Sequence, residues 1–555
     1  MPPLLTLSRA LTLLSLGAAL LPAWAAPLPD SPAALEQRLA ARLSGDRSGA
    51  CVQAAVIERD RVVRGSACAG TRSDSAPGPG AAFEIGSVSK TMTAFLVAGL
   101  IQRGQWSLDD PIARHLPEGT AVPRQGERQI LVRDLLTHSA GLPGLPPGMP
   151  MPKPEDPYAA LTEAQLLAAL GRVTLTRAIG SQAEYSNFGM MLVSLAVARS
   201  LGGDLEAALR ERLFVPLGMG GAYVTRPLTA RPAGGHLPGG AATPAWTITP
   251  NLAGVGMVKA TLDDMVRYAR AELGSLPDTP VALTEALRLT QQPLANGFAM
   301  NWVVGKPQGR ELRLHEGGTG GFSSLVVLEP GQQRAVVLLA DTALTDLGGL
   351  SDLGLALLGL DVPLLPRREV AMPAALRRAM VGDWDVGGVT LQIREAADGR
   401  LLGQARGQSE FELRQDSRGD LYPTSFSALL RPESPEAEGR PVQRLSWHQG
   451  GGLMQGRRIG SVEAAPAIAN PAWRDWAGEY QLAPQFSLRI FERDGRLMVQ
   501  GSGQSAIAAE PAGPDRIEIK GVGAVVEFER DAAGQVVAAV LRQGGQVLRG
   551  AALKR

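Results

Sequence analysis

The sequence predicts an α+β protein, in which an antiparallel sheet flanked by helices and carrying a helical lobe is followed by two small all-β, barrel-like domains. Strand-like runs lie at both ends of the segment 26–362, with helical runs between them. A proline-marked linker at 363–373 then precedes short alternating runs that contain an internal repeat. The length of 555 residues also exceeds what one hydrophobic core usually holds.

Residues 1–25 have the pattern of a secretory signal peptide. Arg9 precedes a short apolar run, and the small residues Ala23 and Ala25 flank Trp24. The apolar run is too short to span a bilayer stably, so we expect cleavage after Ala25. The mature protein is then expected to be periplasmic or secreted, without an integral membrane segment. An uncleaved membrane anchor is the alternative.

A helix and a hairpin are the first elements expected after the signal. The run PAALEQRLAARL has the apolar spacing of an amphipathic helix. In CVQAAVIERDRVVRGSAC, a turn at Arg59 and Asp60 would place Cys51 opposite Cys68, because facing positions then sum to 119. A disulfide between these two cysteines is therefore geometrically possible and suits an exported protein. A longer turn would shift this register.

Helical spacing recurs through the middle of the segment 26–362. It runs from Ser89 to Arg103 and again near 161–171, 187–213, 261–273 and 347–360. At 312–341, LRLHEGGTGGFSSLVVLEPGQQRAVVLLAD reads as three strands separated by glycine-rich and Pro-Gly turns. We therefore expect strands from both ends of the segment to share one sheet, with a helical lobe inserted between them.

Two copies of one small all-β domain are predicted beyond the linker, at 374–468 and 469–555. VGDW at 381 is echoed by AGEY at 477, LQI at 391 by LRI at 488, and DGRLLGQARGQS at 398 by DGRLMVQGSGQS at 494. The offset is always 96 or 97 residues. A length of about 90 residues per copy suits a small barrel or sandwich.

Charge and composition exclude several classes of partner. Lys and Arg total 55 against 54 for Asp and Glu, so no basic surplus is available for nucleic acid or an anionic membrane. No cluster of Cys or His has zinc-ligand spacing, and neither a metal nor another cofactor is predicted. Small neutral molecules remain as partners.

The stretch FEIGSVSKTMTA places Ser87 three residues before Lys90, where a strand-like run gives way to a helix. Residues at this spacing share one helix face, so the amine can approach the hydroxyl. The helix N-terminus favours a developing alkoxide, and burial can lower the pKa of the lysine until it acts as a base. The plain alternative is a serine that caps a helix.

Two later motifs strengthen the interpretation of Ser87 as a nucleophile. EYSNFG places Tyr185 and Asn187 at the start of a helical run, where a phenol can relay a proton and an amide can hold a carbonyl. The alternative is that Tyr185 packs and Asn187 caps the helix. HEGGTGGFSS places His315 on a strand end before glycines, against which a substrate could lie as an added strand. A turn histidine before a flexible loop is the alternative.

FEIGSVSK, YSN and HEG, in this order, resemble the three motifs of the penicillin-recognising serine hydrolases. This family includes class C β-lactamases, D-Ala-D-Ala carboxypeptidases, D-aminopeptidases and related esterases. GQWSLDDPIARHLP and ILVRDLLTHSAGLP also resemble connecting segments of the family. The resemblance covers about residues 30 to 360 and implies a β-lactamase-like fold that uses a covalent acyl-enzyme.

The resemblance implies a role for each motif residue. Ser87 would be the acylated nucleophile and Lys90 its general base, with Tyr185 as the alternative base. Tyr185 would otherwise pass a proton to the leaving group, and Asn187 would contact the substrate amide.

In the third motif, His315 stands where many relatives have the lysine of K-T-G, and Gly317 matches the glycine. The backbone N–H groups of Ser87 and Gly318 would form the oxyanion hole. A lysine at this position attracts a substrate carboxylate at any ordinary pH, whereas His315 is mostly neutral above pH 7. The replacement of lysine by histidine therefore weakens the expectation of a penicillinase or a C-terminal carboxypeptidase.

An H-x-G motif followed by two all-β domains resembles the D-aminopeptidase architecture. There, a loop from a barrel can reach the mouth of the active site, and HQGGGLMQG near 448 is a candidate for such gating. An ordinary hairpin turn is the alternative. His138, Asp263 and Asp264 are interpreted as packing and capping residues.

The sequence thus predicts an exported serine hydrolase that cleaves amide bonds of small peptides, including ones with D- or non-standard residues. A carboxylesterase or a β-lactamase with the same site is the alternative among enzymes. A β-lactam or peptidoglycan sensor that is acylated without turnover is the alternative outside them.

Overall fold

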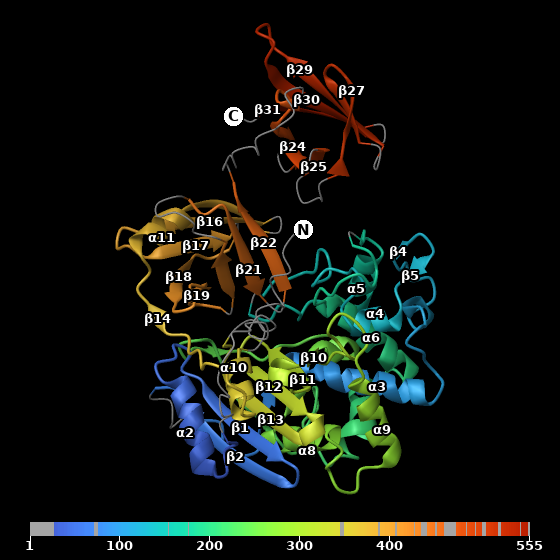
Figure 1. Ribbon diagram of the computed structural model, residues 1–555, viewed down its shortest axis with the longest axis vertical. Helices are drawn as coiled ribbons and strands as arrows, with labels where there is room; N and C mark the ends of the chain where they lie inside the picture. The colour runs from blue at the N-terminus through green and yellow to red at the C-terminus, as the bar shows by residue number, and fades with distance from the viewer. Residues whose placement is uncertain are drawn as a thin grey trace.

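The computed structural model divides into three bodies of different secondary structure (Figure 1). A large mixed α and β body comes first in the chain, and two β bodies follow it. The structure describes residues 27–70, 76–153, 155–175, 177–344, 349–386, 389–405, 408–426, 428–433, 441–449, 452–459, 473–483, 486–493, 496–501, 507–519, 523–543 and 546–552. The predicted signal peptide lies outside these residues.

Within the described ranges, the first body is built on a six-stranded antiparallel sheet of order β10-β11-β12-β13-β1-β2. Its strands are β1 (Cys51–Glu58), β2 (Arg61–Cys68), β10 (Val303–Gly305), β11 (Leu312–Gly318), β12 (Ser323–Glu329) and β13 (Arg334–Ala340). Because β1 pairs with β13, the N-terminal hairpin and the later strands complete one sheet, and the three strands predicted in 312–341 are confirmed as β11, β12 and β13.

The β1–β2 hairpin has the register that the spacing predicts. Cys51 faces Cys68 and Glu58 faces Arg61, so the turn consists of Arg59 and Asp60. Arg59 adopts the left-handed conformation, with a φ of 56°. Cys51 and Cys68 are joined by a disulfide. The exposed tip of the hairpin therefore sets a register that brings both cysteines together at its other end.

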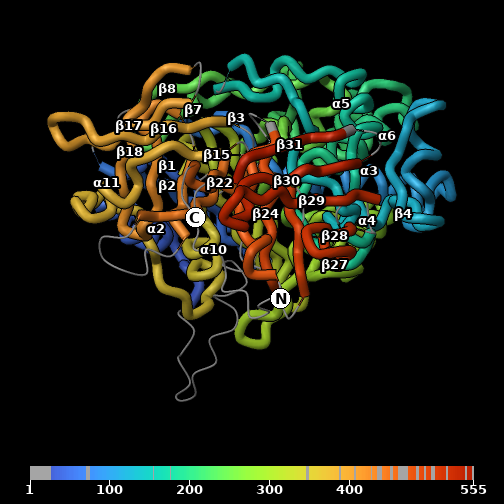
Figure 2. The backbone as a smooth tube through the Cα atoms, turned by 90° about the horizontal axis from the view of Figure 1, so that it is seen from above, coloured from blue at the N-terminus to red at the C-terminus, as the bar shows by residue number. Residues whose placement is uncertain are grey.

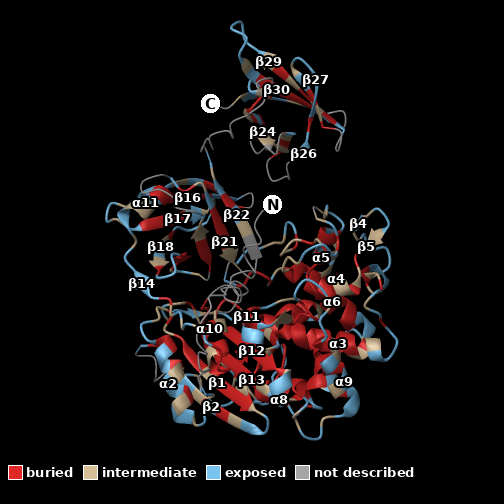
Figure 3. Ribbon diagram, viewed as in Figure 1, coloured by how far each residue is buried: buried red, intermediate tan, exposed pale blue. Residues whose placement is uncertain are grey.

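Side chains alternate across the sheet into two separate cores. On one face, Val326, Val337 and Leu339 pack into the core shared with the helical lobe. On the other face, Leu325 and Leu338 pack against helices near the two ends of the first body. Figure 3 shows the buried residues gathered in the sheet and in the helices beside it.

The helices of this body largely follow the predicted spacing. They are α2 (Pro32–Leu43), α3 (Ser89–Gln102), α4 (Val132–Leu136), α5 (Glu163–Leu170), α6 (Asn187–Ser200), α7 (Leu205–Leu209), α8 (Leu262–Glu272), α9 (Val281–Thr290) and α10 (Ser351–Leu357). The single helical run predicted for 187–213 is wrong, because Gly202 and Gly203 take positive φ values and Asp204 caps a new helix. A π-helical turn, Arg210–Phe214, follows α7.

The second body is a closed antiparallel sheet among the strands that the structure describes. Its strands are β15 (Gly382–Val386), β16 (Val389–Glu395), β17 (Leu401–Ala405), β18 (Phe411–Asp416), β19 (Leu421–Pro423), β20 (Leu429–Pro432), β21 (Arg444–Gln449) and β22 (Gly452–Arg458). Each strand pairs with the next, and β15 pairs with β22 to close the sheet. A helix that was not predicted, α11 (Ala374–Met380), precedes β15.

The third body is a second antiparallel sheet of similar strand order, in which no pairing between the end strands β26 and β27 is found among the described residues. Its strands are β23 (Gly478–Ala483), β24 (Phe486–Arg493), β25 (Arg496–Gly501), β26 (Ile507–Ala508), β27 (Glu510–Gly513), β28 (Arg516–Ile519), β29 (Ala524–Arg530), β30 (Val536–Gln543) and β31 (Gln546–Ala552). The first strand, β23, again pairs with the last, β31. In the view from above, β31, β30, β29 and β28 follow one another in that order (Figure 2).

Equivalent residues of the repeat occupy equivalent positions. Gly382 and Gly478 open the first strand of each copy with φ values of 148° and 149°. The buried Trp384 donates to the carbonyl of Met380, and the buried Tyr480 donates to the carbonyl of Trp476, four residues earlier in both cases. The two β bodies therefore share one fold, as the sequence repeat predicts.

The segment predicted as a linker takes part in the second body. Glu369–Val370 forms β14, which pairs with β18. Arg367 donates to the buried carboxylates of Asp416 and Asp420. Arg47 of the first body stacks 3.4 Å from the ring centroid of Tyr422. Pairing and buried charge thus connect the first two bodies at this point.

No single helix in the described part of the chain is long and apolar enough to cross a membrane. By length and composition, only the pair formed by α6 with the segment Leu205–Phe214 passes such a test, and it is bent by 80°. Most residues of α6 are buried within the protein.

Candidate active site

Ser87 lies in a single 3-10 turn, Gly86–Val88, between the short strand β3 (Ala81–Glu84) and α3. The turn is fixed at its end, because the Ser89 hydroxyl donates to the Gly86 carbonyl and accepts from the Val258 N–H. Ser87 keeps 7% of its surface exposed, whereas its neighbours in α3 are almost fully buried. The serine is therefore held rigidly at the surface of a packed core.

Lys90 lies beneath Ser87 on the first turn of α3 and is fully buried. Its Nζ lies 2.8 Å from Ser87 Oγ and donates to the carbonyl of Val255 at 2.7 Å. Burial holds the pKa of Lys90 well below its ordinary value. A neutral amine at hydrogen-bond distance from a serine hydroxyl can remove its proton.

Tyr185 covers Lys90 from the segment that precedes α6. The Lys90 Nζ lies 4.9 Å from the centroid of the phenol ring. Burial raises the pKa of Tyr185, and the neighbouring Ser87 hydroxyl partly opposes this effect. The phenol is therefore protonated at neutral pH and can donate a proton close to the serine.

Asn187 is the first residue of α6, and it does not cap the helix. Ser186 is the N-cap, because its hydroxyl accepts the N–H of Gly189. The capping role considered for Asn187 is therefore wrong. The buried Asn187 amide instead donates to the Tyr158 hydroxyl at 3.1 Å.

His315 lies on β11 and is buried beside Tyr185, with 6.5 Å between the two ring centroids. Its Nδ1 lies 2.6 Å from the carbonyl of Glu316, and its Nε2 is buried without a hydrogen-bond partner in the described structure. Burial and the nearby Lys90 amine lower the pKa of His315 to about 3. The imidazole is therefore neutral at physiological pH.

Gly317 and Gly318 bring the end of β11 against the turn that carries Ser87. A β-carbon on Gly317 would lie 2.0 Å from the Ile85 carbonyl oxygen, which accepts a hydrogen bond from Ser324 at 2.7 Å. Gly86 has a φ of 50° and touches the backbone of Gly318. Glycine at positions 86 and 317 is therefore required for backbone contact between the two segments.

The structure thus brings together all seven residues that the sequence predicts for the site: Ser87, Lys90, Tyr185, Asn187, His315, Gly317 and Gly318. Cys51 and Cys68, the two cysteines predicted to pair, form their disulfide in the β1–β2 hairpin. Asp264 caps α8 by accepting from the Thr261 N–H, and Asp263 forms a surface ion pair with Arg64.

Sequence reasoning missed two groups that touch the site. The Val255 carbonyl could not be found, because a backbone acceptor leaves no mark in the sequence. Tyr158 packs edge-on against Trp246 at 5.5 Å between ring centroids and contacts Asn187. It follows a proline-rich stretch that gave no signal of structure.

The sequence model of the protein family described as Beta-lactamase matches residues 34–359. The chain belongs to the β-lactamase family. The match confirms the resemblance drawn from the three motifs and assigns the first body to the fold of this family.

Curated relatives of this β-lactamase-family protein match the same body. The D-alanyl-D-alanine-carboxypeptidase/endopeptidase AmpH of Escherichia coli K12 is 28% identical over 291 residues, which are 48% of this chain and 73% of the relative. Penicillin-binding protein 4 of Amycolatopsis lactamdurans is 30% identical over 284 residues, 47% of this chain and 72% of the relative. A crystal structure of a β-lactamase/D-alanine carboxypeptidase from Yersinia pestis is 22% identical, covers 56% of this chain and 92% of its own, and has a TM-score of 0.46.

As a member of the β-lactamase family, the protein is a serine hydrolase that cleaves amide bonds through an acyl-enzyme. No group of His, Cys, Asp and Glu side chains in the described part of this chain could hold a metal ion.

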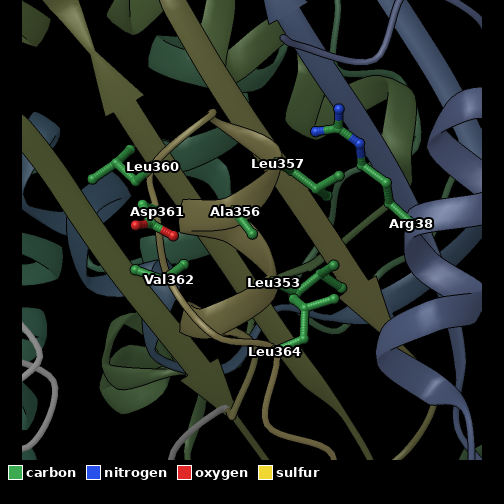
Figure 4. Close-up of a pocket in the computed structure, with 8 residues that line it drawn as sticks. All are labelled: Arg38, Leu353, Ala356, Leu357, Leu360, Asp361, Val362 and Leu364. Carbon is green, nitrogen blue, oxygen red and sulfur yellow. The ribbon is translucent and has the colours of Figure 1, made fainter. Parts of the chain in front are cut away.

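Figure 4 shows a surface pocket of about 310 Å³ in the same body. It is lined mainly by leucines of α10 and the segment that follows, with Arg38 of α2 at its edge. None of the site residues lines this pocket.

The described residues of the HQGGGLMQG segment considered for gating lie at the end of β21 and in β22. Gln449 faces Gly452 in the register of these two antiparallel strands. The two connecting residues, 450 and 451, lie outside the described residues.

Proposed function

We propose that Ser87 is the nucleophile and Lys90 its general base in the hydrolysis of amide bonds of small peptides. The 2.8 Å contact between Ser87 Oγ and the buried Lys90 Nζ carries this proposal. Lys90 removes the hydroxyl proton while Ser87 Oγ attacks the substrate carbonyl carbon. The N–H groups of Ser87 and Gly318 stabilise the oxyanion that forms.

Tyr185 delivers a proton to the leaving amine as the tetrahedral intermediate collapses, because a protonated phenol next to the serine is suited to this step. The C–N bond breaks, the amine departs and Ser87 remains acylated. Lys90 returns the proton that it accepted to Tyr185. A water molecule then attacks the acyl carbon and gives a proton to Lys90, the bond between the acyl carbon and Ser87 Oγ breaks, the carboxylic acid leaves, and Lys90 passes the proton to Ser87 Oγ. Asn187 holds the substrate amide beside the reacting carbonyl.

The proposed substrates are peptides that contain D- or non-standard residues and that are recognised without a charged C-terminus. A neutral His315 supplies no positive charge for a substrate carboxylate at the third motif. The Escherichia coli relative is named as a D-alanyl-D-alanine-carboxypeptidase/endopeptidase, which supports D-alanine peptides as the class. Endopeptidase or aminopeptidase cleavage suits a neutral third motif better than carboxypeptidase cleavage does.

We further propose that the protein acts in the periplasm or outside the cell. The signal pattern at 1–25 and the disulfide between the two cysteines of the sequence support export. The N-terminus of the protein recovered from a periplasmic extract should be Ala26. Recovery of the full-length chain in the cytoplasmic fraction alone would contradict this proposal.

The test of the proposed function is kcat/KM for D-alanine p-nitroanilide and for the matching p-nitrophenyl ester, with Ser87→Ala as the control. We expect turnover of both substrates and loss of both in the variant. Turnover of the ester alone would replace the amidase proposal with a carboxylesterase. Acylation without turnover of either substrate would favour a sensor.

A further inference from the structure

His138 holds both sides of Tyr185 through hydrogen bonds to its neighbours. The His138 carbonyl accepts the N–H of Glu184 at 2.8 Å, and the imidazole Nδ1 accepts the N–H of Ser186 at 3.2 Å. The His138 ring also lies 4.5 Å from the Tyr185 ring, measured between centroids. One residue therefore fixes the backbone before and after the tyrosine and supports the face of its phenol.

The hydrogen bond to Ser186 fixes the tautomer of His138. Because Nδ1 accepts, the ring proton lies on Nε2, which is buried and has no hydrogen-bond partner in the described part of the structure. Burial, followed by the nearby Lys90 and His315, holds the pKa of His138 well below its ordinary value. The ring is therefore neutral, and it can keep accepting from Ser186.

His138 is itself held firmly. It follows the short helix α4, and the neighbouring Thr137 hydroxyl donates to the Arg133 carbonyl at 2.8 Å. The Phe298 ring packs edge-on against the His138 ring at 5.2 Å. His138 has a φ of 54°, a conformation that histidine and asparagine adopt more readily than most residues.

We propose that His138 is a positioning residue, which holds the Tyr185 phenol over Ser87 and Lys90 so that it can deliver a proton to the leaving group. The inference rests on the role proposed above for Tyr185. Ser186 has extended backbone angles, with a φ of −129° and a ψ of 106°, so no helical hydrogen bond fixes the chain at this point. The Nδ1 of His138 supplies the acceptor that the Ser186 N–H would otherwise lack.

If His138 positions Tyr185, its loss should affect a substrate according to whether the leaving group of that substrate needs a proton. An alkoxide or an amine requires a proton as it departs, whereas p-nitrophenolate departs without one. Loss of the His138 contacts should therefore slow the hydrolysis of amides and alkyl esters much more than the hydrolysis of p-nitrophenyl esters. A general loss of folded protein would slow both kinds equally.

The experiment compares kcat/KM for the p-nitroanilide, methyl ester and p-nitrophenyl ester of D-alanine in the full chain. For His138→Ala we expect a roughly 100-fold loss on the anilide and methyl ester, and a loss under about 5-fold on the p-nitrophenyl ester. His138→Asn should recover the first two substrates to within about tenfold of wild type, because its amide oxygen can replace Nδ1 and asparagine tolerates the positive φ.

Phe298→Leu is the matched control, since leucine keeps an apolar side chain against the His138 ring, and residue 298 makes neither of the hydrogen bonds to the Tyr185 segment. It should leave the ratio between substrates unchanged. If the alanine variant does not fold, His138→Gln, whose amide lies one carbon further out, should show the selective loss. Equal losses on all three substrates, or the same selective loss in Phe298→Leu, would overturn the inference.

Failure of the proposed function would give a different result. If the wild-type protein hydrolyses both esters but not the anilide, the amidase proposal fails. The contrast between the methyl and p-nitrophenyl esters then still tests His138.

Discussion

Gly86 lies so close to Gly318 that a β-carbon on Gly86 would be 2.4 Å from the Gly318 backbone nitrogen. The two glycines join the turn that carries the nucleophile to the end of β11. The N–H groups proposed for the oxyanion hole belong to Ser87 and Gly318. Ser87 follows Gly86 in the chain, and the backbone of Gly318 is in contact with Gly86. The spacing of this pair of donors is therefore set by the absence of a side chain at Gly86.

We predict that Gly86→Ala separates the two proposed oxyanion donors and lowers kcat/KM roughly 100-fold or more. The methyl group would meet backbone atoms that cannot move aside, and a φ of 50° is unfavourable for alanine. Unfolding free energy should fall by about 1–3 kcal/mol. Gly220→Ala is the control, because no atom lies within 4 Å of its added methyl group. Full activity of Gly86→Ala would exclude this arrangement of donors.

We predict that the free energy of unfolding rises more steeply with pH in the wild type than in the Lys90→Met variant. Burial lowers the pKa of Lys90 below its ordinary value of 10.5, so between the two pKa values the unfolded chain binds more protons than the folded one. Each pH unit in that window adds about 1.4 kcal/mol of stability. Urea unfolding from pH 6 to 10 measures the difference between the two proteins. Parallel curves would show that the folded amine is not neutral.

The same neutral amine makes a kinetic prediction. Because only the unprotonated form can accept the Ser87 proton, kcat/KM should rise with pH through the depressed pKa of Lys90 and level off well below pH 10.5. The pH profile of acylation under single-turnover conditions measures this. An increase that continues up to 10.5 would favour another base.

Much of the fold could be predicted because its signals are local. The hairpin register follows from two cysteines and a turn, and the sequence repeat follows from short motifs at a fixed offset. The division of 187–213 was missed because the apolar spacing continues past Gly202 and Gly203, where the positive φ values of the glycines and the Asp204 cap separate two helices. The helix α9 was also missed, although its apolar residues have helical spacing after Pro280.

The site could be predicted only as far as its motifs extend. Ser87, Lys90, Tyr185 and His315 belong to patterns of residue type and spacing. Tyr158 and His138 are instead brought to the site by tertiary packing. His138 was interpreted as a packing residue because its sequence neighbours carry no sign of the distant N–H that its ring accepts.

We predict that Glu272 makes the protein less stable as pH rises from about 4.5 to about 8. Burial raises the pKa of Glu272 to about 8, from an ordinary value of 4.5. In that window the folded chain binds more protons than the unfolded chain, so stability is present below the window and falls by about 1.4 kcal/mol for each pH unit crossed. Glu272→Gln removes the titration, and its unfolding free energy should lack this slope. Equal slopes in both proteins would contradict the prediction.

We predict that replacement of both cysteines, in Cys51→Ala/Cys68→Ala, lowers the unfolding free energy by about 3 kcal/mol, as expected for a loop of this length. Guanidinium unfolding measures the loss, and wild-type protein treated with a reductant should show a similar one. Thiol labelling of the denatured, unreduced protein should find no free cysteine. Two labelled thiols would contradict the disulfide.

We predict that His315→Lys shifts preference toward peptides with a free C-terminal carboxylate. The measurement is the ratio of kcat/KM for a D-alanyl-D-alanine peptide to that for its C-terminal amide. An ammonium group at the third motif would attract the carboxylate, but burial at this position disfavours its charge, so we expect only about a tenfold rise, equivalent to about 1.4 kcal/mol. His315→Gln stays neutral and should keep the wild-type ratio. An unchanged ratio in a His315→Lys protein whose Ser87 still reacts with a fluorophosphonate would mean that the third motif does not face the substrate C-terminus.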